Sequence, residues 1–108
     1  MTFKEIASMI DDTKLPNAYY QFPDGTSQAC PFICFYYPNR DDTFADNVNY
    51  AQKVELIVEL YTDTKDFTAE AGVESVLTGA GLTFSKDENY IDSERMWQIA
   101  YSTEVYID

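Results

Sequence analysis

Two cysteines are the residues in this sequence whose chemistry depends most on their spacing. Cys30 and Cys34 stand four residues apart in the segment CPFIC. In an extended chain their Cα atoms lie roughly 13 Å apart, beyond the reach of a disulfide bond. The chain has no histidine and no third cysteine, so a zinc site and a thiol–imidazole nucleophile both lack a partner residue. We expect two buried thiols in a reducing compartment.

Carboxylates are the other reactive groups, and they are abundant. Neighbouring acids that a catalytic dyad would need are Asp11/Asp12, Asp41/Asp42 and Asp87/Glu88. In a chain with 19 acidic residues, adjacent acids are expected on solvated faces rather than in a catalytic pair.

Loops typical of calcium or phosphate binding are also lacking. Residues 63–66 and 87–89 do not have the spaced aspartates and terminal glutamate of a calcium loop. Gly79 and Gly81 follow a predicted helix, whereas phosphate binds at the start of a helix. The sequence therefore predicts a protein that is not an enzyme and that uses no metal or cofactor.

The charge of the chain restricts its partners. Nineteen acidic and seven basic residues give a net charge of −12, which repels phosphate backbones and disfavours direct nucleic-acid binding. An acidic surface of this kind can line a passage through which DNA slides, or it can imitate DNA and fill a basic cleft. A soluble acidic surface with no special partner is the third interpretation.

Length and composition predict one folded domain over residues 1–108. Aromatic residues make up 16% of the chain, which suits a core, edge strands and surfaces that meet other proteins. We predict no signal peptide, because Lys4 and Glu5 interrupt the N-terminus, and no apolar run approaches the ~20 residues of a membrane span.

The residue pattern in the first half of the chain predicts a helix followed by strands. Thr2 and Glu5 form a capping-box pattern that starts a helix, which should end near Asp12 because Pro16 follows. Residues 18–22 suggest a short strand, residues 23–26 a turn, and residues 32–37 a strand that is covered on both faces or by a neighbouring subunit.

The second half contains the clearest periodicities. Apolar residues alternate in a strand at residues 50–61, and a helix capped by Asp66 or Thr68 follows and stops at residues 79–81. Residues 82–84 start another strand and residues 85–93 form a charged excursion. Residues 95–107 form a final long strand, with Trp97 and every second residue after it on one face.

The expected order is α-β-β-β-α-β-β, an α+β fold with a mainly antiparallel sheet and helices on one face. The second face of such a sheet should be polar, yet apolar residues fall on it. We interpret them as subunit contacts, and the alternative is that the first helix or the loop after Pro38 covers that face. The candidate subunit-interface residues are Ile57, Tyr61, Tyr90, Met96 and Tyr106.

Four stretches of the sequence together resemble one group of proteins. They are the helix-forming start, the aromatic-rich residues 30–37, the passage KVELIVELYTDTKD and the closing SERMWQIAYSTEVYI. In order and size they resemble small neck and tail proteins of long-tailed bacteriophages and Gram-positive prophages, in particular the tail terminator or tail completion proteins. The resemblance is one of element pattern over nearly the whole chain, and the head-completion proteins of the neck share it.

The resemblance implies an α+β subunit that closes into a ring of six subunits on top of the tail tube. The ring would stop tube polymerisation, bind the tail tube protein and the head connector, and let DNA pass through an acidic lumen without specific binding. The protein would then reside in the virion, and in the host bacterial cytoplasm during assembly. The expected tube or neighbour contact is the loop of residues 39–49, with candidate contacts at Asn39, Arg40, Asp41, Phe44 and Val48.

Two other functions compete with this one. An acidic DNA-mimic inhibitor of a host nuclease or DNA-binding protein would present carboxylates spaced like phosphates on a monomer or dimer. A small-ligand-binding α+β module is the third hypothesis, and the sequence offers no Gly-rich or basic pocket to support it.

Overall fold

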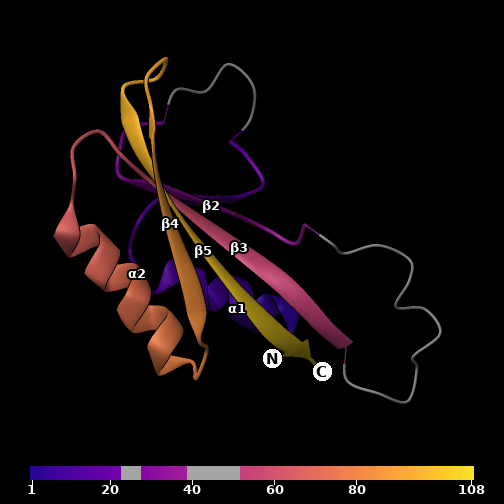
Figure 1. The fold of residues 1–108 in the computed structure, drawn as a ribbon. Coiled ribbons are helices and arrows are strands. Elements are labelled where there is room, and N and C mark those ends of the chain that lie inside the picture. The colour runs from indigo at the N-terminus through magenta and orange to yellow at the C-terminus, as the bar shows by residue number, and fades with distance from the viewer. Residues whose placement is uncertain (23–27, 39–51) are drawn as a thin grey trace.

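The computed structural model describes residues 1–22, 28–38 and 52–108. Within these residues five strands form one sheet, and two helices pack against one of its faces (Figure 1). The elements are α1 (Phe3–Asp11), β1 (Asn17–Tyr19), β2 (Phe32–Tyr36), β3 (Gln52–Thr62), α2 (Phe67–Gly79), β4 (Phe84–Ile91) and β5 (Met96–Ile107). The predicted α+β class and element order are confirmed.

The sheet has the strand order β1-β2-β3-β5-β4. β1 runs parallel to β2, and the other neighbouring strands are antiparallel. The longest ladder joins β3 to β5, from Gln52 opposite Ile107 to Thr62 opposite Trp97. The two strands with the clearest alternation in the sequence thus lie side by side.

The core lies between this sheet and the two helices. Alternate residues of β3 and β5 point into it, as their period of two predicts. α1 contributes Ile6, Met9 and Ile10, and α2 contributes Val73 and Leu77. The strand residues buried there are Ile33, Phe35, Val54, Leu56, Val58, Leu60, Ile99, Tyr101, Val105 and Ile107.

Both helices begin at residues that satisfy the free N–H groups of a first turn. At α1 the hydroxyl of Thr2 accepts a hydrogen bond from the Glu5 N–H at 3.1 Å, and the Glu5 carboxylate accepts one from the Thr2 N–H at 2.7 Å. Of the two caps predicted for α2, Asp66 is the one used, because its carboxylate accepts from the Ala69 N–H at 3.0 Å. The predicted stop is confirmed at Gly81, whose φ of 79° suits glycine.

Two predicted boundaries are wrong. Residues 85–93 were expected to be a charged excursion, but β4 continues to Ile91 because its charged side chains find partners on α2 and at Lys65. The first strand was expected to reach Phe22, but β1 ends at Tyr19 because Tyr20 has a φ of 68°, outside the range of a strand. The turn predicted at residues 23–26 lies outside the described residues.

A buried carboxylate joins α2 to the sheet. The side chain of Glu70 is almost fully buried, and its two oxygens lie 2.7 Å from Lys65 Nζ and 2.8 Å from Lys86 Nζ. Lys86 also pairs with Glu74 at 2.8 Å, and the hydroxyl of Tyr101 donates to Glu74 at 2.8 Å. Glu70 is therefore the centre of an ion-pair network that joins α2 to β4 and to Lys65.

The network lowers the pKa of both glutamates. Burial on its own would raise the pKa of Glu70, but the bonds from Lys65 and Lys86 outweigh it and hold the pKa below its ordinary value of 4.5. At Glu74 the hydrogen bond from Lys86 is the main cause of a lowered pKa. Both carboxylates therefore remain charged in the folded protein.

Replacing Glu70 by glutamine should destabilise the fold at neutral pH. Removing one partner of a fully buried ion pair costs ~3–5 kcal/mol, and we expect about 2 kcal/mol here because the lysines are partly exposed. A lowered pKa stabilises the fold above the unfolded-state pKa, and this stabilisation disappears as the pH falls through the folded-state pKa. In urea titrations, the difference between the wild type and Glu70→Gln should thus be constant above about pH 5 and shrink in more acidic solution.

The matched control is Glu94→Gln, an exposed acid in the turn between β4 and β5. It should change the free energy of unfolding by less than about 0.5 kcal/mol. Equal effects of the two variants at pH 7 would contradict the role given to Glu70.

Candidate functional site

The sheet face opposite the helices is the candidate site, and we call it the open face. It carries the alternate residues of β3 and β5 that point away from the core, and no described helix covers it. Four predicted interface residues lie on it: Ile57, Tyr61, Met96 and Tyr106. Tyr106 is 60% exposed and the other three are half-buried.

The fifth predicted residue, Tyr90, is not brought together with these four. It lies opposite Trp97 in the β4–β5 ladder, on the face that the helices cover, and its ring contacts the Trp97 ring edge-on at 5.3 Å. The predicted contact residues Asn39, Arg40, Asp41, Phe44 and Val48 lie outside the described residues.

One part of the open face is covered by the segment that follows β1. The left-handed conformation of Tyr20 turns the chain so that Tyr20 and Phe22 lie against β2. The alternative in which α1 covers this face is wrong, because α1 packs into the core on the other side. The covering loop that was the other possibility begins after Pro38 and is not described.

This segment and the strands enclose a hollow of about 620 Å³, which we call the aromatic hollow. Phe32 stacks on Tyr61 with ring centroids 4.9 Å apart, and Phe22 meets Phe32 edge-on at 5.5 Å. Tyr20 meets Tyr36 edge-on at 5.8 Å. The residues that line the hollow are Tyr20, Gln21, Phe22, Gln28, Phe32, Cys34, Tyr36, Glu59 and Tyr61.

Glu59 is the charged group of the aromatic hollow. Its carboxylate accepts hydrogen bonds from the hydroxyls of Tyr61 at 2.9 Å and Tyr36 at 3.3 Å. Burial, with the added charge of Glu59, raises the pKa of both tyrosines, so their hydroxyls remain donors. Among the described residues Glu59 forms no ion pair with a lysine or arginine.

Both cysteines are free thiols, and of the two that were expected to be buried Cys34 is buried while Cys30 is only partly so. Cys34 lies in the floor of the aromatic hollow, where burial and then the Glu59 charge raise the pKa of its thiol. Burial and then Asp63 raise the pKa of Cys30. Neither environment favours the thiolate that a nucleophile would need.

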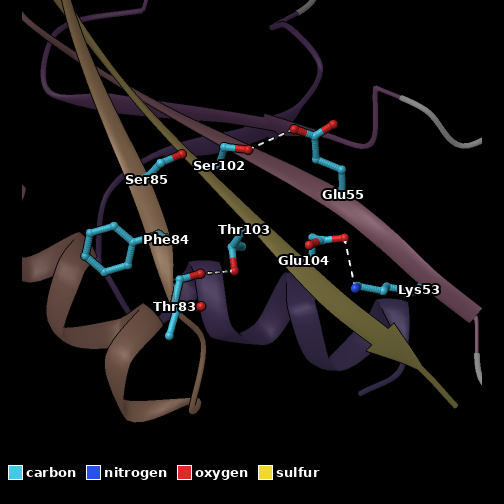
Figure 2. Close-up of a pocket in the computed structure, with 8 residues that line it drawn as sticks. All are labelled: Lys53, Glu55, Thr83, Phe84, Ser85, Ser102, Thr103 and Glu104. Atoms are coloured by element: carbon cyan, nitrogen blue, oxygen red, sulfur yellow. Dashed lines mark hydrogen bonds and ion pairs between the residues drawn. The ribbon is translucent and has the colours of Figure 1, made fainter.

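A second hollow, of about 670 Å³, lies at the other end of the open face (Figure 2). It forms because β4 begins only at Phe84, opposite Thr103. The end of β5 after Thr103 therefore has no β4 residue beside it. Its carboxylates are already engaged: Glu55 accepts from the Ser102 hydroxyl at 2.8 Å, and Glu104 lies 3.4 Å from Lys53 Nζ. Within residues 1–22, 28–38 and 52–108, no group of three or more Cys, Asp or Glu side chains could hold a metal ion.

Comparisons with known proteins do not assign the chain to a family. The sequence matches no protein-family model, and no curated protein matches it. Of the helices described, none has the length and apolar character needed to cross a bilayer.

The cover over Cys34 can be tested by thiol labelling. Cys34 is buried and Cys30 is half-buried, so an aromatic disulfide reagent should react with Cys34 roughly tenfold more slowly than with Cys30. The variants Cys30→Ser and Cys34→Ser isolate one thiol each, and their rates should converge once guanidinium unfolds the protein. Equal rates in the folded protein would mean that Tyr20 and Phe22 do not cover Cys34.

Proposed function

We propose that this protein is a structural subunit that assembles into a ring, as a tail-terminator-like protein of a phage or prophage. The ring, of six subunits in the resembling family, would cap the tail tube and bind the head connector. On this proposal the protein resides in the virion, and in the host bacterial cytoplasm during assembly.

The observation that supports the proposal most is the composition of the open face. A sheet with helices on one side normally presents a polar face to water. Here Ile57, Met96 and Tyr106 lie on that face, and Tyr106 is the most exposed of them. Tyrosine and methionine are enriched in protein interfaces, so a second protein surface is the occupant that this composition favours.

The charge of the chain is consistent with a ring that DNA crosses. At −12 per subunit, a closed ring would repel the DNA backbone and keep it from binding within the lumen. The competing DNA-mimic hypothesis requires carboxylates that are free to replace phosphates. On the open face Glu104 is paired with Lys53 and Glu55 accepts a hydrogen bond from Ser102, which weakens that alternative.

Replacing Tyr106 by serine should weaken self-association without unfolding the protein. Light scattering of the wild type should show a discrete ring-sized species that grows with concentration and with salt. Salt is needed because it shortens the screening length from about 30 Å at 0.01 M to about 8 Å at 0.15 M, which reduces repulsion between acidic subunits. Tyr106→Ser should shift the midpoint of this transition to roughly tenfold higher concentration.

The control is Phe67→Ser, which removes an aromatic ring that is 72% exposed at the start of α2, away from the open face. It should leave the assembly midpoint unchanged. A wild type that stays monomeric with and without added tail tubes, and that captures a basic nuclease, would replace the ring by the DNA-mimic function.

A further inference from the structure

We infer that the aromatic hollow is a receptor for a cationic side chain, and that its occupant is Arg95 of a neighbouring copy of this chain. The inference deepens the proposed function, since it rests on self-association and names the contact that joins one subunit to the next.

Three lysine side chains of this protein lie in similar surroundings. Lys65, Lys86 and Lys53 each pair with at least one glutamate and also lie near an aromatic ring. The distances from Nζ to the ring centroid are 5.2 Å for Lys65 and Phe67, 5.9 Å for Lys86 and Tyr101, and 5.7 Å for Lys53 and Tyr106. A carboxylate beside an aromatic ring is thus the environment in which these three lysines are held.

The aromatic hollow contains aromatic rings and a carboxylate like those that surround these lysines, but no lysine or arginine is among its described lining residues. It offers five aromatic rings and the Glu59 carboxylate. The tyrosine hydroxyls that donate to Glu59 are neutral, and no described lysine or arginine pairs with its negative charge. A cation placed there would gain from the charge of Glu59 and from the ring faces, and shielding from water strengthens both effects.

Of the cations that the structure describes, Arg95 is the best placed to enter a neighbour's hollow. Among the described residues, the basic side chains without an ion pair are those of Lys4, Lys14 and Arg95. Lys4 lies on α1 and Lys14 follows it, whereas Arg95 is exposed in the turn between β4 and β5, at the upper end of the sheet in Figure 1. Its guanidinium can stack on an aromatic ring and bond a carboxylate through two N–H groups at once.

The positions of donor and receptor suit a ring. The hollow lies on β2 and β3, and Arg95 lies at the hairpin of β4 and β5, at the same end of the sheet, where Tyr61 of the hollow lies opposite Gln98 of β5. A contact between two different surfaces of the same protein is heterologous, and when repeated it closes into a ring if the rotation permits. One subunit would therefore offer its hairpin to the next and receive a hairpin from the one before.

A charge exchange tests this contact. Arg95→Glu and Glu59→Lys should each weaken association by roughly tenfold or more, as measured by the concentration midpoint in light scattering. A one-to-one mixture of the two variants should associate much more tightly than either alone, since alternating subunits restore one opposite-charge pair at every interface. A purely structural role for Glu59 would not produce this rescue.

Lys4→Glu is the matched control, because it changes the net charge by the same amount as Arg95→Glu on a helix away from the hollow. It should leave the midpoint within about twofold of the wild type. Should Glu59→Lys fail to fold, Tyr20→Ser replaces it: it removes a ring that is 63% exposed at the hollow, and it should weaken association.

The outcomes separate the two proposals. A wild type that associates while Arg95→Glu associates equally well overturns the Arg95 contact and leaves the ring intact. A wild type that stays monomeric at every concentration and salt, even with tail tubes, overturns both.

Discussion

The pairing of β3 with β5 fixes the position of nearly everything else in the described structure. Both strands alternate, so their register decides which residues enter the core and which form the open face. A slip of one residue would place Glu55 and Glu59 in the core and leave Val58 and Leu60 in water. The buried side chains of α1 and α2 complete the core only because this register holds, and β2 and β4 then add at either side.

Much of this architecture could be predicted from the sequence, because periodicity and capping are local signals. The alternation of β3 and β5, the capping box of α1 and the Asp66 cap of α2 all depend on residues close in sequence. The start of β4 was predicted but its extent was not, because its residues after Phe84 are mostly polar and charged and their lysine and glutamate partners lie far away in the sequence. The buried ion pairs of Glu70 likewise join residues that no local pattern connects.

The candidate site was foreseen only in part, for the same reason. The alternation of side chains along β3 and β5 correctly assigned Ile57, Tyr61, Met96 and Tyr106 to one face. Tyr90 lies on the other face. Which residues of β4 point to which face is decided by its pairing with β5, and the sequence does not indicate that pairing. The aromatic hollow requires Tyr20 and Phe22 to fold across β2, and that path depends on the left-handed conformation of Tyr20, which no sequence pattern indicates.

The charged edge strand β4 has a consequence for how subunits can accumulate. Exposed edge strands invite other strands to add by backbone hydrogen bonds, which leads to fibrils. A second β4 aligned against the first would bring one lysine and two acids beside those of its copy, and the Lys86 and Glu88 side chains are already paired with α2 and Lys65. The charges of β4 thus disfavour amyloid-like growth through this edge at high protein concentration. An ordered assembly would instead use side-chain contacts, which are all occupied once the assembly closes.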